Sequence, residues 1–304
     1  MREIIKITIA LTVSCLLAGL VIGATFIFTA RAKQHNEHLN MQQTMLELLG
    51  YGPRHPAPPE LRLYQIHHYI IRDGDILNTG YMVPARNGAS EGYALVVIDL
   101  AGRLLSHYSL DLTADQALSE EDRKKALMRV LTQAESVDFA ETIIIGCLGQ
   151  KRTAYLLTGE FPGFKTFIKA LAALSIDFKL LGLEVIEHEE DPGLGGEIIQ
   201  PYFKNQFVGK TFDKIKELKV VKEPLPSEYE RYLESMGLEG SGLSAEDLAE
   251  IEKNYKNGDI YALTGATISS VAVTNGVKGM VKKFAYRIHI LDQAVEAGGV
   301  PVLF

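Results

Sequence analysis

The sequence contains little cysteine, and this scarcity excludes several kinds of site. Its two cysteines are Cys15, inside an apolar run, and Cys147, which stands alone. A disulfide framework, a cysteine-ligated zinc site and an iron–sulfur cluster all need more cysteines than this, or cysteines placed in pairs. We therefore expect no disulfide, no metal site and no cluster from this chain.

Basic residues are also in the minority, and the deficit is uneven along the chain. The formal net charge is -7, yet the first 33 residues carry about +3, so the remainder is close to -10. A nucleic-acid-binding domain usually presents a basic surface. An acidic body therefore argues against nucleic acid as the main partner.

Charge is missing altogether between residues 7 and 30, a run of 24 residues. As a helix, such a run is long enough to cross the roughly 30 Å core of a bilayer. A cleaved signal peptide has a shorter apolar region, usually about 7–15 residues. Lipid modification of Cys15 is another alternative, but Thr12 fits the usual leucine position poorly. We predict that residues 1–33 are an uncleaved single-pass anchor in the inner (cytoplasmic) membrane, with the body on the periplasmic or outer side.

The chain after the anchor is a stalk followed by strands. Residues 34–60 form the stalk and linker, with a helix over 34–50 and a proline-rich segment over 52–59. Residues 64–83 and 94–110 each predict a β-hairpin, because apolar β-branched runs flank short turns such as Asp73-Gly74-Asp75.

The middle of the chain predicts helices alternating with short strands. We expect a helix over residues 113–137, with a start signal at Ser119, and a strand over 141–148. The spacing of apolar residues over 166–174 predicts another helix.

The most informative stretch lies near the C-terminus and reads Thr-Gly-Ala-Thr-Ile-Ser-Ser from Thr264 to Ser270. Small residues let a ligand approach the backbone, and four hydroxyls fall within seven residues. The following apolar positions, from Val273 to Ile288, repeat like one face of a helix, so the hydroxyls are typical of an N-cap. A helix N-terminus suits a phosphate group, although an ordinary capped helix without a ligand fits the same pattern.

This stretch resembles the [Ser/Thr]-Gly-Ala-Thr motif of the FMN-binding domain family. The family includes the G subunit of the Rnf complex and the C subunit of the sodium-translocating NADH:quinone reductase. The resemblance implies that Thr267 carries FMN through a phosphoester, and that a cradle for the phosphate is formed by Thr264, Gly265, Ala266, Ser269 and Ser270. One position departs from the family: an Asp is usual six residues before the modified Thr, and Tyr261 stands here. Asp259 lies two residues further upstream.

Two further blocks extend the resemblance. His188 to Gly195 reads His-Glu-Glu-Asp-Pro-Gly-Leu-Gly and is similar to the family pattern His-x-Glu-Thr-Pro-Gly-Leu-Gly; Asn205 to Lys210 is a third family-like block. The resemblance implies that the flavin ring is contacted by Glu190, Pro192, Gly193, Leu194 and Gly195. His188 and Glu190 could equally be structural hydrogen-bond partners.

These observations lead to one fold and one main function. We expect an α+β protein: an N-terminal transmembrane helix, then an extracytoplasmic FMN-binding domain over residues 61–304 with a mostly antiparallel sheet and an insertion at about 111–170. The resemblance implies an electron-transfer subunit with covalent FMN in an Rnf-type ferredoxin:NAD oxidoreductase coupled to ion translocation. Its partners would be the other membrane subunits and a flavin transferase.

Two alternatives remain open at this point. One is the FMN subunit of another membrane redox complex, such as an NADH:quinone reductase. The other is an anchored binding module that has lost the flavin. The chain shows no recognisable acid–base or nucleophile constellation, so no independent catalytic residue is predicted.

Overall fold

The computed structural model describes residues 2–88, 90–236 and 243–304, and it divides into two units. The first unit ends at Glu47 and the second runs from Leu48 to Phe304. We call the second unit the body and describe the two separately.

The first unit consists of most of one helix, α1 (Arg2–Leu48). Its segment Arg2–Gly23 is long and apolar enough to cross a membrane, judged by length and composition. Large apolar side chains such as Ile7, Leu16 and Phe26 are exposed along α1. Apolar exposure of this extent is unfavourable in water, which agrees with the anchor that the sequence predicts.

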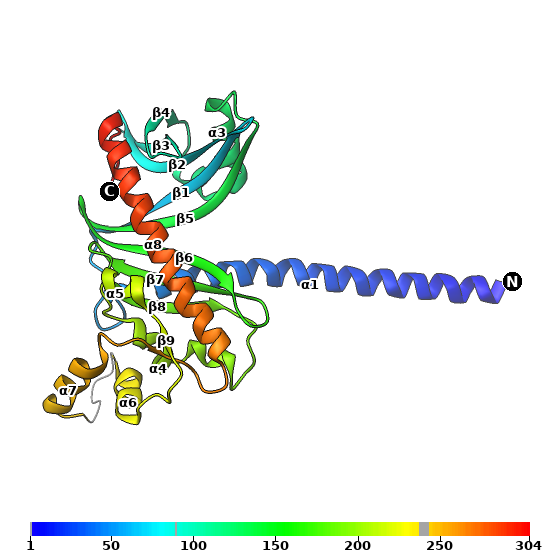
Figure 1. Ribbon diagram of the computed structural model, residues 1–304. Coiled ribbons are helices and arrows are strands. Elements are labelled where there is room, and N and C mark those ends of the chain that lie inside the picture. The colour runs from blue at the N-terminus through cyan, green and yellow to red at the C-terminus, as the bar shows by residue number, and fades with distance from the viewer. Residues whose placement is uncertain (1, 89, 237–242) are drawn as a thin grey trace. The chain divides into compact units, whose positions relative to one another are not determined.

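An eight-stranded antiparallel sheet forms the frame of the body (Figure 1). Its strand order is β4-β3-β2-β1-β5-β6-β7-β8. Two meanders of four strands are therefore joined where β1 pairs with β5. The strands are β1 (Leu61–Asp73), β2 (Ile76–Asn87), β3 (Ser90–Asp99), β4 (Leu104–Leu110), β5 (Ser136–Leu148), β6 (Lys151–Pro162), β7 (Phe167–Ser175) and β8 (Leu180–Glu187).

Both faces of the first meander are covered. In β3, Val96 and Ile98 face the main core, whereas Leu95 and Val97 face a second core. Successive side chains of a strand point to opposite faces, so a strand covered on both sides is a continuous apolar run. The second core is closed by α2 (Ala114–Leu118) and α3 (Glu120–Val130). Leu127 of α3 packs into this core.

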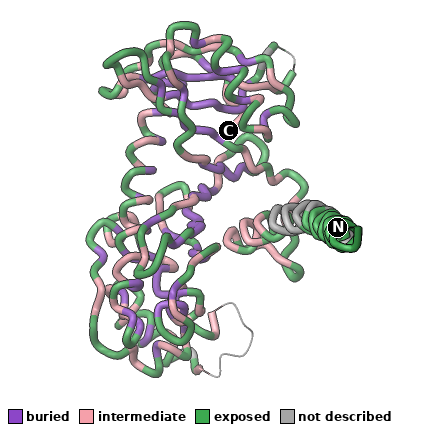
Figure 2. The backbone as a smooth tube through the Cα atoms, turned by 90° about the vertical axis from the view of Figure 1, so that its right-hand side faces the viewer, coloured by how far each residue is buried: buried purple, intermediate pink, exposed green. Residues whose placement is uncertain are grey.

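The long helix α8 (Thr267–Gly298) covers the main core and passes both meanders. Near its start it contacts η1 (Gly195–Ile199), further along it contacts β6, and near its end it contacts β3 and β4 (Figure 1). Its buried residues Val273, Val277, Val281, Phe284 and Ile288 repeat at helical spacing. Figure 2 shows that buried residues, coloured purple, occur throughout the body.

Short elements fill the chain between β8 and α8. They are α4 (Pro201–Lys204), η2 (Asn205–Phe207), α5 (Phe212–Glu217), α6 (Ser227–Ser235) and α7 (Ala245–Tyr255). A two-stranded parallel pair, β9 (Val220–Val221) and β10 (Ile260–Tyr261), leads directly into the turn before α8. A small third cluster around Tyr229, Leu233 and Ile251 joins α6 to α7.

Both predicted hairpins, the mostly antiparallel sheet and the long C-terminal helix are confirmed. The predicted helix over 166–174 is wrong, because these residues form β7 between β6 and β8. Its Ala-Leu-Ala-Ala-Leu run has high helix propensity, but its backbone groups pair on both sides and its residues 170–174 are buried. Tertiary pairing therefore overrides the local preference.

The predicted helix over 113–137 is also corrected. Ser119 ends α2 and caps α3, accepting a hydrogen bond from the Asp122 N–H at 3.3 Å. The helix stops at Val130, and β5 already begins at Ser136, five residues before the predicted strand. The segment 111–170 thus supplies β5 and β6 to the middle of the sheet, and whether it is an insertion relative to the family stays a prediction.

Candidate flavin site

The turn before α8 has a small residue where a neighbouring side chain packs closely against its backbone. Gly265 has a φ of +76°, a left-handed conformation that favours glycine. A Cβ there would lie 3.0 Å from the Leu194 side chain, so the loop after β8 and this turn touch. Thr264 is exposed, Thr267 is half-buried, and Thr267 is the first residue of α8.

The expected hydroxyl N-cap is not formed. The N-cap residue is Ala266, which has no side-chain cap hydrogen bond. The Ser270 hydroxyl accepts from the Leu263 N–H at 3.0 Å and donates to the Ala266 carbonyl at 3.0 Å. The Ser269 hydroxyl donates to Glu190. Both serines are buried, so they hold the turn together instead of capping the helix.

Because no side chain caps α8, its first N–H groups remain available. Within the described part of the chain, no protein group accepts a hydrogen bond from the N–H groups of Thr267, Ile268 or Ser269. The hydroxyls of Thr264 and Thr267 likewise have no protein partner among the described residues. Free N–H groups at the start of a long helix favour an anion.

Glu190 connects three segments at this point. Its carboxylate is buried at 4% exposure and accepts the backbone N–H groups of Phe164 (2.8 Å) and Lys165 (3.2 Å), as well as the Ser269 hydroxyl. Its own N–H donates to Nδ1 of His188 at 3.2 Å. A buried carboxylate is stabilised when such donors satisfy it. His188 and Glu190 are therefore hydrogen-bond partners, and Glu190 fixes α8 against the turn between β6 and β7.

Two glycines make room for this carboxylate. A Cβ on Gly163 would lie 2.4 Å from one Glu190 oxygen, and a Cβ on Gly195 would lie 2.6 Å from the other. Gly193 has a φ of +73°, which turns the loop and leaves Leu194 46% exposed. The Pro-Gly-Leu-Gly loop is thus shaped by contacts beneath it, while Leu194 faces outward.

A pocket of about 420 Å³ lies beside the turn, and we call it the turn pocket. Its lining includes Leu194, Tyr202, Leu225, Glu230, Tyr261 and Thr264. It is lined by the turn, the loop after β8 and the segment around α6. Its volume falls within the range of about 300–1,000 Å³ that is usual for small-molecule sites.

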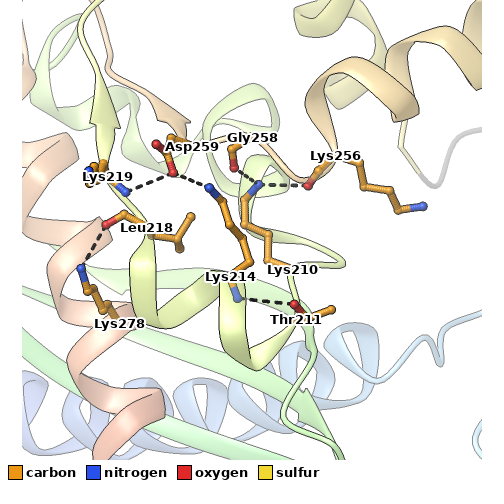
Figure 3. A network of polar contacts seen from close by, with 9 residues as sticks. All are labelled: Lys210, Thr211, Lys214, Leu218, Lys219, Lys256, Gly258, Asp259 and Lys278. Atoms are coloured by element: carbon orange, nitrogen blue, oxygen red, sulfur yellow. Dashed lines mark hydrogen bonds and ion pairs between the residues drawn. The ribbon is translucent and has the colours of Figure 1, made fainter.

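The third sequence block positions the strand that leads into the turn. The buried amide of Gln206 accepts the Tyr261 N–H at 2.7 Å and donates to the Tyr261 carbonyl at 3.3 Å. The Lys210 ammonium donates to the carbonyls of Lys256 (3.1 Å) and Gly258 (2.8 Å), as Figure 3 shows. Burial, with the nearby Lys214 charge, lowers the pKa of Lys210 to about 8.

Asp259 belongs to the same network (Figure 3). It pairs with the Lys214 ammonium at 2.6 Å and accepts the Lys219 N–H at 3.3 Å. Burial opposes the charged form, but these contacts outweigh it and lower the pKa of Asp259. Its carboxylate is therefore engaged in joining α5 to the β9–β10 pair.

Comparison with known proteins identifies this region. Residues 163–282 match the family model described as FMN-binding domain. These residues form an FMN-binding domain. Its first residue is the glycine beside Glu190, and its last lies midway along α8, so the match covers the turn, the loop and the third block.

Three relatives are similar in sequence to this chain. The chain is 33% identical over 135 residues to the G subunit of the proton-translocating ferredoxin:NAD(+) oxidoreductase complex of Clostridium ljungdahlii, a match that spans 44% of this chain and 55% of that protein. It is 26% identical over 205 residues to the G subunit of the ion-translocating oxidoreductase complex of Methanosarcina acetivorans (62% and 88%). It is 25% identical over 249 residues to the C subunit of the Na(+)-translocating NADH-quinone reductase of Vibrio alginolyticus, or NqrC (80% and 87%). The chain is homologous to the G subunit of Rnf complexes and to NqrC.

The FMN-binding domain brings most of the predicted site residues together. Leu194 touches Gly265, Glu190 bonds Ser269, and Gly193, Leu194 and Thr264 line one pocket. Pro192 lies in the same loop, whereas the side chains of Glu190, Ser269 and Ser270 are engaged within the protein. Contact of any of these residues with FMN stays a prediction.

Sequence reasoning missed the residues that act from beneath the site. Gln206 and Lys210 stand in the third block, but nothing in their spacing shows that they bind residues 256–261. Tyr202 lines the turn pocket and donates from its hydroxyl to Glu197 at 3.0 Å. Hydrogen bonds between buried polar groups that are distant in sequence can be identified only from the three-dimensional structure.

Proposed function

We propose that this chain is an electron-transfer subunit of a membrane Rnf-type complex and that it carries FMN covalently on Thr267. The observation that supports this most is the uncapped N-terminus of α8, within a region that matches the FMN-binding family. Among the residues that the structure describes, neither the Thr267 hydroxyl nor the first N–H groups of this helix have a protein partner. The relatives are subunits of ion-translocating oxidoreductase complexes, which supports the same kind of complex here.

The residues present fit the parts of FMN. The phosphate, bonded to the Thr267 oxygen, would accept from the first N–H groups of α8, where the helix dipole favours negative charge. Thr264, Gly265 and Ala266 would surround it with small or hydroxyl-bearing side chains. Leu194 and Gly193 would contact the ring. When bound, FMN supplies transfer of one or two electrons, and the protein sets its position and potential.

The anchor and the partners follow from the same proposal. The apolar segment Arg2–Gly23 would cross the inner membrane once, with the flavin domain on the periplasmic or outer side. Residues 1–33 would be the anchor, 34–60 the stalk and linker, and 61–304 the domain, with the insertion at about 111–170. Partners would be the other membrane subunits and a flavin transferase, and the enzyme would be the whole ion-translocating complex.

Two alternatives keep specific support. The relation to NqrC supports the FMN subunit of an NADH:quinone reductase as a second membrane complex. Tyr261, at the position where the family usually has Asp, supports an anchored binding module without flavin. These alternatives differ in whether the protein carries FMN and in which other proteins copurify with it.

The test is the intact mass of the chain purified from its own host. We expect an increase equal to FMN minus one water, located on the peptide that contains Thr267, and flavin fluorescence on a denaturing gel. Thr267→Val removes the hydroxyl while keeping a β-branched side chain, and it should remove both signals. Thr153→Val, the same change in β6, should keep them.

Each other result decides between the candidates. An unmodified wild-type mass would favour the flavin-free module. A flavin that persists in Thr267→Val would show that another residue is modified. Copurification with the other components of an NADH:quinone reductase would select the second complex.

A further inference from the structure

The turn pocket is lined by two tyrosines that the flavin motifs do not include. Tyr202 comes from α4 and Tyr261 from β10. Ile260, the neighbour of Tyr261, is fully buried in the main core. Because adjacent residues of a strand point to opposite faces, the Tyr261 ring is directed away from the main core, toward the cluster around Tyr229.

The Tyr261 ring is held in place before any ligand binds. Both backbone polar groups of Tyr261 are hydrogen-bonded to the Gln206 amide. Its ring packs edge-on against Tyr229, with centroids 6.3 Å apart and planes at 67°. Tyr229 in turn stacks on Tyr255 at 4.7 Å. A side chain restrained in this way loses little freedom on binding, which favours contact with a flat ligand.

The charges of the turn pocket determine which part of FMN fits there. Glu197 and Glu230 are in its lining, and no Lys, Arg or His is among the described residues that line it. Two carboxylates repel a phosphate, whereas the N-terminus of α8 attracts one. The phosphate therefore belongs at the turn, and the uncharged ring system belongs in the pocket.

We propose that Tyr261 is the aromatic side chain against which the isoalloxazine ring of FMN lies in this protein. This assignment rests on the proposed function. Leu194 and Thr264 line the same pocket, so a ring there would remain within reach of the turn that carries Thr267. The residue that replaces the usual Asp would thus be a positioning residue for the ring, chosen for its flat apolar surface.

Flavin fluorescence tests this contact directly. A phenol that touches the ring quenches the excited flavin by giving it one electron and taking the electron back, with no net oxidation. We expect the emission of the folded, FMN-loaded protein to be several-fold below that of the same sample unfolded in guanidinium. Tyr261→Phe keeps a flat ring but cannot donate that electron, so folded emission should rise several-fold at an equal FMN mass.

Two matched variants make the test specific. Tyr232→Phe removes a phenol of the same cluster that does not line the pocket, and emission should stay at the wild-type level. Tyr202→Phe removes the other pocket phenol, and its effect should be smaller than that of Tyr261→Phe. A larger effect of Tyr202→Phe would assign the ring to Tyr202 and overturn the proposal.

The remaining outcomes separate this assignment from the proposed function. A flavin-loaded wild type whose emission is unchanged by Tyr261→Phe would overturn the assignment alone. A Tyr261→Phe protein that folds but receives no FMN would place Tyr261 in attachment, and not beside the ring. A wild-type chain without FMN mass would overturn the proposed function and the assignment together.

Discussion

The two meanders of the sheet use buried polar groups differently. In the first meander, Arg123 is buried on the second core and donates to the Tyr69 hydroxyl at 3.0 Å and the Ala117 carbonyl at 2.8 Å. These bonds attach α2 and α3 to the sheet. In the chain that follows the second meander, Glu190, Gln206 and Lys210 all bind the segment from Lys256 to Ser269.

This difference shows where the fold supports function. Buried polar groups are costly to desolvate and are kept where their partners are fully placed. Beside the first meander they attach helices to the sheet, and after the second they fix the stretch before and at the start of α8, together with the buried apolar residues Ile260, Leu263 and Ala266. We therefore expect damage to the first half to change stability and damage to the second to change flavin binding.

The largest effect should come from the second core. Leu127→Ala removes a fully buried side chain and should lower the free energy of unfolding by about 2–5 kcal/mol. The variant should still carry FMN, because Leu127 packs in the second core and not against the turn before α8, which we call the flavin turn. Urea unfolding and intact mass measure the two properties. Leu118→Ala, which changes an exposed side chain, is the control. Loss of FMN from a folded Leu127→Ala protein would contradict the proposed difference between the two halves.

The two halves should also respond to opposite ends of the pH range. Burial, with the nearby Arg123 charge, lowers the pKa of His67 in β1 to about 4. The unfolded chain therefore binds more protons between about pH 6.5 and 4, so the His67 contribution to stability is present above pH 6.5 and is lost as pH falls through this window. For Lys210, whose pKa is lowered to about 8, stability should rise as pH increases from about 8 to 10.5.

Unfolding free energies measured across both windows test this assignment. Each change should be on the order of 3 kcal/mol at most. His67→Gln should flatten only the acid slope, and Lys210→Met should flatten only the alkaline slope, although it also leaves two carbonyls without their donor. An acid slope that survives in His67→Gln would point to other buried groups, such as His68.

Glu190→Gln tests the connection beneath the flavin turn. The variant loses the charge that three donors satisfy, and it should cost roughly 1–3 kcal/mol. We also expect a lower fraction of chains with FMN, because Ser269 and the start of α8 lose their fixed partner. Glu189→Gln, on the exposed neighbour, should change neither property. Full FMN loading of a destabilised Glu190→Gln protein would show that the turn keeps its shape without this carboxylate.

The smallest effect should be on the reduction potential. Glu197 lines the turn pocket, and its negative charge disfavours electrons on a neighbouring ring. Glu197→Gln keeps an acceptor for the Tyr202 hydroxyl and should favour the reduced flavin by roughly 1 kcal/mol. A redox titration measures this shift. Glu217→Gln, at the end of α5 and outside the pocket, is the control, and an equal shift there would indicate only a change in net charge.

Much of this architecture could be predicted from the sequence, for reasons that differ by segment. The hairpins over 61–87 and 90–110 follow from local turns, and α8 follows from its apolar repeat. The segment 166–174 could not be read in this way, because β7 depends on strands that pair with it from both sides. In the site, the motif identified the turn, but the partners of Ser269 and Tyr261 lie 79 and 55 residues away in sequence.

Because of helix α8, the segment that matches the family model is not the same as the segment that folds. Its 32 residues extend about 48 Å, from the flavin turn to β3 and β4. A fragment cut at residues 163 and 282 would keep every flavin motif but would lose six of the eight strands and half of this helix. Truncations and domain transplants should therefore keep the whole body from Leu48 onward, because the segment that matches the family is smaller than the segment that folds.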